Sequence, residues 1–112
     1  MIDNYTFGEF VVDGKTYKSN IELIGEKVKP HHYLENHLLE LKDFKDIINA
    51  KPSIIIIGTG ASGTIHPPKE IIEHIEGKGI KLIMEKTEDA CKTYNDLLEK
   101  GEKVAALLHN TC

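Results

Sequence analysis

One ten-residue segment, residues 54–63 with the sequence IIIIGTGASG, constrains the fold of this chain more than any other. Its four isoleucines follow Pro52, and a short β-branched run of this kind is typical of a central parallel strand that is buried on both faces. The glycines that follow match the pattern G-x-G-x-x-G at Gly58, Gly60 and Gly63. On pattern alone, the segment matches the strand-and-turn fingerprint of dinucleotide-binding proteins.

The residues after the turn argue against a dinucleotide site. In such a site the third glycine lies inside the following helix, whose N-terminal N–H groups reach the pyrophosphate. Here Pro67 and Pro68 follow soon after Gly63, and prolines cannot continue a helix that has already begun. Glu85 ends the next apolar run, but only three parallel strands are evident, which leaves no second half to hold the other nucleotide. We expect no cofactor, and we favour a structural turn between a buried strand and a helix.

The same turn supports a second interpretation, a site for a small anion or another small ligand. Hydroxyl side chains and the N–H groups of the turn lie at the carboxyl end of the strand, where ligands bind in parallel sheets. The turn lacks the lysine and following serine or threonine of a P-loop, so it does not indicate triphosphate hydrolysis. The candidate ligand-binding residues are Gly58, Thr59, Gly60, Ser62, Gly63, Thr64 and His66.

The C-terminal half, residues 52–112, alternates between strand and helix patterns. Isoleucines recur on one helical face after Pro68, and Thr87 stands where an N-cap would precede the next helix. This order predicts a parallel β-α-β-α-β unit. The expected strands are 53–57, 80–85 and 103–108, and the expected helices are 68–76 and 88–100.

The N-terminal part, residues 1–26, is predicted to form an antiparallel β-meander. Asp13-Gly14 is a strong hairpin signal, because both central positions of such a turn favour positive φ. The expected strands are 5–12, 15–18 and 20–25. The sequence therefore predicts an α/β fold with three layers, in which helices flank a central, mostly parallel sheet and an antiparallel β-meander precedes it.

The segment between these two parts has weaker signals. Residues 26–41 have no clean period, and we expect them to be irregular. Asp43 resembles a helix N-cap, with Phe44, Ile47 and Ile48 on one face of the helix that follows. No stretch has the composition of a linker, so we expect residues 1–112 to form a single domain.

Composition excludes several classes of partner. The net charge is −4, and the chain has fourteen lysines, no arginine and no basic block, so we expect no nucleic-acid partner. No apolar run approaches the roughly 20 residues of a membrane helix, and the first residues lack the pattern of a signal peptide. We therefore expect a cytoplasmic protein that does not enter a membrane.

Histidine and cysteine supply the remaining candidate chemistry. His109 precedes Cys112 by three residues, which would suit a thiolate-imidazolium pair or half of a metal site. The carboxylate that ends the chain opposes thiolate formation at Cys112, so an incidental tail is favoured over catalysis. Cys91 falls on the apolar stripe of its helix and is expected to be a small buried hydrophobe.

A second histidine cluster lies in the segment expected to be irregular. His31, His32 and His37, with Glu35 between them, lack the i, i+4 spacing that places two imidazoles on one helical face. We favour solvated loop histidines over a metal site here. His74 lies off the apolar stripe of its helix and is expected to be exposed.

The chain resembles a known family over nearly its whole length. The resemblance combines the N-terminal strands, IIIIGTGASG, the helix and strand TEDACKTYNDLLEKGEKVAAL and the ending HNTC. This pattern is similar to the small α/β domain of the adipogenesis-associated domain-containing protein and of mitochondrial complex I assembly factor three. The resemblance implies a three-layer architecture and a role in protein assembly or regulation, without an established catalytic mechanism.

Two departures from that family limit what the resemblance implies. We expect no mitochondrial presequence, and the chain has no tryptophan in the middle segment, where His32-Tyr33 and Asn36-His37 stand. A role in respiratory complex assembly is therefore not transferred. Tyr94 continues the buried stripe and Asn95 lies beside it; we favour a structural bracket over a catalytic pair.

Two functions remain at this stage. The first is a non-enzymatic binding or assembly module whose exposed sheet edge or meander face meets a protein partner or a second copy of the chain. The alternative is a small-anion or small-ligand protein, or an enzyme, that uses the loop 58–63. We favour the first, because no acid, base and nucleophile converge at the loop in sequence.

Overall fold

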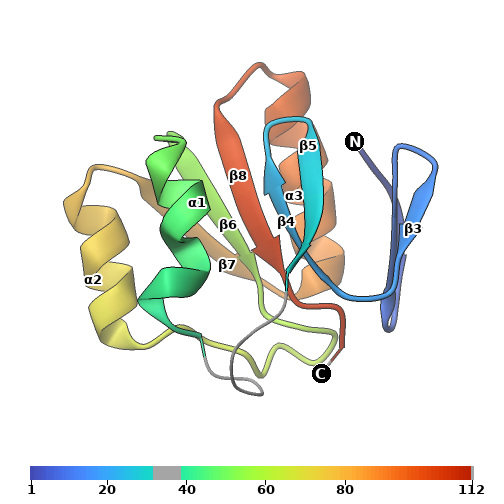
Figure 1. The fold of residues 1–112 in the computed structure, drawn as a ribbon, viewed down its shortest axis with the longest axis horizontal. Helices are drawn as coiled ribbons and strands as arrows, with labels where there is room; N and C mark the ends of the chain where they lie inside the picture. Colours follow the sequence, from blue (N-terminus) through green and yellow to red (C-terminus); the bar gives the residue numbers. More distant parts are fainter. Residues whose placement is uncertain (32–38, 112) are drawn as a thin grey trace.

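The computed structural model describes residues 1–31 and 39–111. Five strands come first, and helices and strands alternate after them from Leu41 onward; Figure 1 shows how they are arranged. The strands are β1 (Ile2–Thr6), β2 (Glu9–Val12), β3 (Lys15–Tyr17), β4 (Asn20–Ile24), β5 (Lys27–His31), β6 (Ile54–Gly58), β7 (Lys81–Glu85) and β8 (Val104–Leu108). The helices are the short 3-10 helix η1 (Leu41–Phe44), α1 (Lys45–Asn49), α2 (Lys69–Gly77) and α3 (Thr87–Glu99).

The central sheet has five strands in the order β5-β4-β8-β6-β7. β6 pairs in parallel with both β7 and β8, as the β-α-β-α-β pattern predicts. β4 runs antiparallel to β8 and to β5, so two of the four pairings are antiparallel. The predicted α/β class is confirmed, and the sheet is mixed.

The two innermost strands explain why the isoleucine run is so apolar. All five residues of β6 and all five of β8 are buried. Alternate side chains enter different cores: Ile56 packs on one face of the sheet, while Ile55 and Ile57 pack on the other. A strand covered on both faces needs apolar side chains at every position, which is the pattern of residues 54–57.

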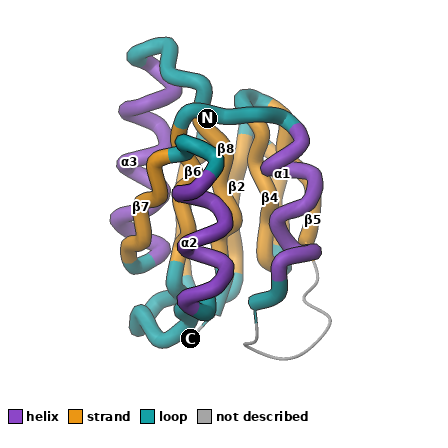
Figure 2. The backbone as a smooth tube through the Cα atoms, turned by 90° about the vertical axis from the view of Figure 1, so that its left-hand side faces the viewer, coloured by secondary structure: helices purple, strands orange, loops and turns teal. Residues whose placement is uncertain are grey.

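Helices cover both faces of this sheet, as Figure 2 shows. On one face α3 and the three-stranded sheet β1-β2-β3 close a core that includes Phe10, Ile56 and Tyr94. On the other face η1, α1 and α2 close a second core around Phe44, with Ile75 from α2. The layers agree with the predicted three-layer arrangement.

The predicted meander differs from the structure in two ways. The single strand expected over 5–12 is two strands, β1 and β2, joined by a turn in which Gly8 has a φ of 87°. The strand expected at 20–25 is β4, which leaves the meander and pairs with β8 in the central sheet. Ile21 and Leu23 are buried there, because the central sheet offers a covered face that a third hairpin strand would lack. The meander therefore ends at Tyr17 instead of residue 26.

The expectation of an irregular segment over 26–41 is wrong for its first residues, which form β5. Lysines at positions 27 and 29 alternate with Val28 and Pro30, so no apolar run marks this strand. Proline is tolerated because β5 is an outer strand. Asp43 is also not an N-cap: Glu40 holds that position, and the Asp43 carboxylate accepts the Glu40 N–H at 2.8 Å from the third position of η1.

Candidate functional site

The glycine turn after β6 is shaped by close approach and by positive φ. A Cβ atom on Gly58 would lie 2.8 Å from Leu108 Cδ2 and 3.0 Å from Thr87 Oγ1. Gly60 and Gly63 have φ values of 99° and 74°, a region that L side chains rarely adopt. The three glycines are thus explained by the path of the backbone, with no ligand required.

The backbone N–H groups of this turn are directed at oxygen atoms of the protein itself. Five of them donate hydrogen bonds within the chain. The Thr59 N–H donates to the Glu85 carbonyl (2.8 Å), the Gly60 N–H to the Thr87 hydroxyl (2.9 Å) and the Ala61 N–H to the Thr111 carbonyl (3.2 Å). The Gly63 N–H donates to the Gly60 carbonyl (3.3 Å), and the Ile65 N–H donates to the Thr59 carbonyl (3.0 Å). An anion-binding turn instead directs several N–H groups at one external point.

Thr87 connects this turn to the rest of the sheet. Its hydroxyl accepts from the Gly60 N–H at 2.9 Å and donates to the His109 carbonyl at 2.8 Å, while its own N–H donates to the Gly60 carbonyl at 3.1 Å. The side chain is fully buried. The prediction that Thr87 caps its own helix is wrong, because Lys86 holds the N-cap position and the Thr87 hydroxyl binds other elements.

The predicted ligand-binding side chains are divided between the interior and the surface. Thr59 is buried, and its hydroxyl donates to the Glu85 carbonyl at 3.0 Å. Ser62, Thr64 and His66 are exposed. The structure therefore brings the backbone of this set together without directing all its side chains to one point.

The C-terminal residues contribute to the same end of the sheet. His109 is buried, and its N–H donates to the Gly58 carbonyl at 3.1 Å. Its Nε2 lies 3.4 Å from the Thr111 hydroxyl. Cys112 lies outside the described residues, so the incidental tail that the sequence favours, and the alternative pairing of His109 with Cys112, both stay untested.

The other histidine cluster falls largely outside the described part of the chain, which omits His32, His37 and Glu35. His31 is described, and its Nε2 lies 3.0 Å from Asp43 Oδ1. Within residues 1–31 and 39–111, no group of three or more histidine, cysteine, aspartate or glutamate side chains could hold a metal ion.

Tyr94 and Asn95 both bind backbone groups of other elements. The Tyr94 hydroxyl donates to the Gly25 carbonyl, and burial raises the pKa of Tyr94. The Asn95 side chain accepts from the Ile2 N–H at 2.9 Å and donates to the Ile2 carbonyl at 2.8 Å. These contacts are those of a structural bracket between α3, β1 and the turn after β4.

Cys91 is buried in α3, as its place on the apolar stripe predicts. Burial raises the pKa of Cys91 to about 12, and the negative charge of Glu88 adds to that effect. The side chain is therefore a neutral thiol at neutral pH, without the thiolate that a nucleophile needs.

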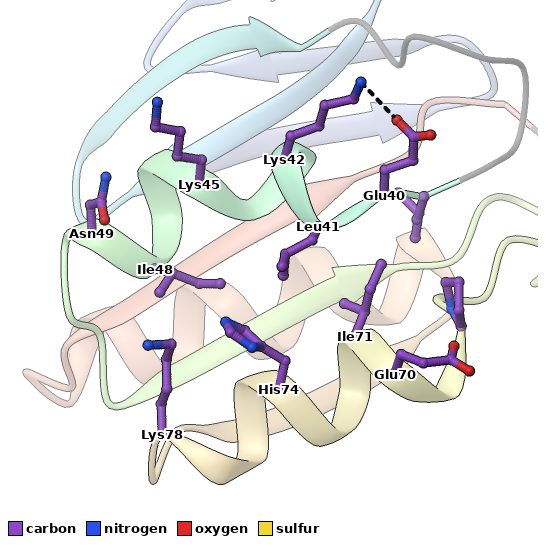
Figure 3. Close-up of a pocket in the computed structure, with 12 residues that line it drawn as sticks. Glu40, Leu41, Lys42, Lys45, Ile48, Asn49, Glu70, Ile71, His74 and Lys78 are labelled. Carbon is purple, nitrogen blue, oxygen red and sulfur yellow. Dashed lines mark ion pairs between the residues drawn. The ribbon is translucent and has the colours of Figure 1, made fainter.

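A groove of about 850 Å³ lies between η1–α1 and α2, on the face of the sheet opposite α3. Figure 3 shows Leu41 and Ile48 facing Ile71 and His74 across it. Leu39 and Pro68 complete the apolar wall. Leu41 is 44% exposed, a large value for a leucine, so the groove presents apolar surface to solvent.

The two ends of this groove carry different charges. Lys78 and Asn49 lie at one end, and Glu40 and Glu70 lie at the other (Figure 3). Glu40 is partly neutralised by Lys42, whose Nζ lies 3.2 Å away. No sequence pattern predicts this surface, because its residues come from separate segments and share no motif.

A smaller hollow of about 300 Å³ lies beside β4, β5 and α1. Its Glu22 carboxylate is buried and lies 3.1 Å from Lys29 Nζ, which also lies 2.5 Å from Asp46. The hydrogen bond that Lys29 donates to Asp46, together with the nearby Glu22 carboxylate, raises the pKa of Lys29, and the same hydrogen bond lowers the pKa of Asp46. This ion-paired cluster connects α1 with β4 and β5.

The model of a family described as "Protein of unknown function (DUF498/DUF598)" matches residues 2–109. The chain belongs to this family. The "13 kDa major membrane protein" of Francisella tularensis subsp. holarctica (strain LVS) is 30% identical over 106 residues, which are 93% of this chain and 85% of that protein. The match agrees with the expected small family of largely unknown function.

Solved structures of similar fold cover the whole chain. The protein MT938 is 26% identical, with a TM-score of 0.84, over 100% of this chain and 98% of its own. A conserved hypothetical protein from Pyrococcus horikoshii OT3 is 21% identical, with a TM-score of 0.89, over 100% and 99% of the two chains. The second likeness concerns the fold alone.

The name of the Francisella relative bears on the expected location. That relative is called a membrane protein, whereas no helix within the described ranges of this family member is long and apolar enough to cross a bilayer. The cytoplasmic location expected from the sequence therefore stays a prediction.

Proposed function

We propose that this chain is a non-enzymatic protein-binding module with an assembly or regulatory role, and that the groove between η1–α1 and α2 is its docking surface. One observation carries the proposal: an open groove of about 850 Å³ has apolar walls, with Leu41 44% exposed. Apolar surface in a concave site, bordered by polar groups, is typical of protein interaction sites. The resemblance to assembly-linked proteins agrees with this role.

The groove fits an amphipathic helix of a partner protein. Two helices flank it, and Leu41, Ile48 and Ile71 offer contacts for an apolar helical face. Lys78 at one end would attract the negative end of the partner's helix dipole, and Glu70 at the other would attract the positive end. The partner is thus expected to present apolar residues at helical spacing and an acidic residue near Lys78.

Site-specific photo-crosslinking tests this proposal. A photoreactive phenylalanine analogue at Leu41 should capture a defined protein from native lysate, whereas the same analogue at exposed Lys92 on α3 should not. Lys78→Glu should weaken the capture without changing the far-UV circular dichroism. Identical products from the Leu41 and Lys92 positions would contradict the groove as a docking surface.

The alternative, a small anion at the loop 58–63, has weaker support, because five N–H groups of the region already donate to protein oxygens. It is tested by titrating phosphate, nucleotides and sugar phosphates while following the amide resonances of Gly58 to Thr64. Saturable shifts confined to these residues would favour the anion site over the binding module.

We also propose that the protein is cytoplasmic, as the sequence leads us to expect. Cell fractionation separates the possibilities: recovery with the cytosol would support it, and recovery with membranes after a high-salt wash would overturn it. The second result would match the name of the Francisella relative.

A further inference from the structure

The open edge of β7 differs from the other outer edge of the central sheet. β5, at one edge, carries Lys27, Lys29 and Pro30, which are typical devices against edge-to-edge pairing. β7, at the other edge, has the sequence KLIME, and its three central residues include no lysine and no proline. Met84 is 41% exposed and Ile83 is only partly buried. This edge therefore has an apolar centre, with Lys81 and Glu85 at its two ends.

The backbone of β7 has a fixed set of outward groups. The Lys81 N–H donates to Ser53 at 3.0 Å, and the Glu85 carbonyl accepts from Thr59 at 2.8 Å, so residues 81 and 85 face β6. Since backbone groups alternate along a strand, the N–H and C=O groups of Leu82 and Met84 face the open side. Any added strand must pair with these two residues.

The sequence of β7 is complementary to itself in one antiparallel register. When two copies are centred on Ile83, Leu82 of each lies opposite Met84 of the other, and both residues have outward backbone groups. Lys81 of each copy then lies opposite Glu85 of the other, at a non-hydrogen-bonded pair where side chains approach closely. If this register shifts by one residue, outward backbone groups of one copy lie opposite residues whose backbone groups face away. If it shifts by two residues, Lys81 no longer lies opposite Glu85 in either pair.

We infer that two copies of this chain associate through antiparallel pairing of β7, which joins their central sheets across a two-fold axis. Charge complementarity supports this partner: Lys81 is exposed and Glu85 is only partly buried, so opposite charges meet at both ends of the paired strands. Lys81 of the second copy brings a positive charge to the Glu85 carboxylate. The inference goes beyond the proposed docking function, because no β7 residue lines the groove.

Sedimentation equilibrium of the purified chain tests this dimer with charge reversals. Lys81→Glu or Glu85→Lys replaces two attractive pairs by two repulsive ones, so each should weaken dimerisation by roughly tenfold or more. The double variant Lys81→Glu with Glu85→Lys restores opposite charges and should return the dissociation constant toward that of the wild type. Lys92→Glu, an equal charge change on exposed α3, is the matched control and should change it little.

A backbone variant tests the pairing independently of charge. Met84→Pro removes an outward N–H that β6 does not use, so it should abolish dimerisation while circular dichroism shows a folded monomer. A wild-type chain that stays monomeric at the highest attainable concentration would overturn the inference. The inference would also be overturned if either charge reversal raised the dissociation constant no more than Lys92→Glu does. A double variant whose dissociation constant does not return toward that of the wild type would overturn it as well. The groove proposal is unaffected by each of these results.

Discussion

The loop after β6 and the groove between η1–α1 and α2 differ in how their groups are satisfied. In the loop, five N–H groups donate to protein oxygens, and a Cβ on Gly58 would clash with its neighbours. In the groove, Leu41 is 44% exposed and faces a hollow of about 850 Å³. The polar groups of the loop are therefore bonded within the fold, whereas the groove leaves apolar side chains exposed to solvent.

This difference shows why a conspicuous motif is a poor guide to function here. Glycines in the loop are required by positive φ and close packing, and both requirements are internal to the fold. A docking surface needs no particular residue order, since its side chains come from segments that only the fold brings together. Substitutions should therefore cost much stability at the loop and little at the groove.

Thr87→Val is expected to have the largest effect on stability. The substitution preserves shape but removes the acceptor of the buried Gly60 N–H and the donor to the His109 carbonyl. Leaving buried polar groups without these bonds should lower the free energy of unfolding by about 3 kcal/mol. Urea denaturation followed by circular dichroism measures this change.

Thr87→Ser is the matched control, because it keeps the hydroxyl and loses one methyl group. It should retain most of the stability that Thr87→Val loses. Equal losses for the two variants would show that packing, and not the hydroxyl, joins the loop to α3 and β8.

Gly58→Ala is expected to have the next largest effect. The added methyl group would lie 2.8 Å from Leu108 Cδ2 and 3.2 Å from Leu108 Cα, so β8 must shift. Overpacking of this kind should lower the free energy of unfolding by about 2 kcal/mol. Gly77→Ala is the control: no atom lies within 4 Å of its Cβ, and alanine should stabilise this end of α2. Equal effects at the two glycines would contradict a tight junction at Gly58.

The parts of the fold that sequence predicts correctly are those with strong local patterns. The isoleucines of β6 and the apolar stripes of α2 and α3 reflect burial directly, and their elements lie within about two residues of the expected bounds. The sequence also indicates that Cys91 is buried. These features depend on neighbours in the chain or on a face covered along its whole length.

The parts that escaped prediction depend on partners distant in sequence. β5 carries Pro30 and alternating lysines, and it is a strand because β4 supplies its hydrogen bonds. Thr87 resembles an N-cap, yet its hydroxyl binds Gly60 and His109, which are 27 and 22 residues away. No local pattern specifies such contacts, and the groove was missed for the same reason.

Asn95→Ala extends the comparison along α3, with a smaller expected effect. The variant removes two hydrogen bonds to the Ile2 backbone at a partly buried position, which should cost about 1 kcal/mol. Amide hydrogen exchange should show the loss as faster exchange in β1. Asn95→Asp retains an acceptor for the Ile2 N–H, so its exchange rates in β1 should lie between those of the wild type and those of Asn95→Ala. Equal exchange rates in all three chains would show that the contacts of Asn95 do not stabilise β1.

Leu41→Ser is expected to have the smallest effect on stability and to complete the contrast. Leu41 begins η1, and its side chain is 44% exposed beside the groove, so the folded chain gains little from it. A change within about 0.5 kcal/mol is expected. Because the same side chain offers apolar contact to a docking helix, capture through a photoreactive group placed at Ile48 should nevertheless fall. Loss of stability together with unchanged capture would reverse the comparison, since it would make Leu41 a core residue and leave the groove without its proposed contact.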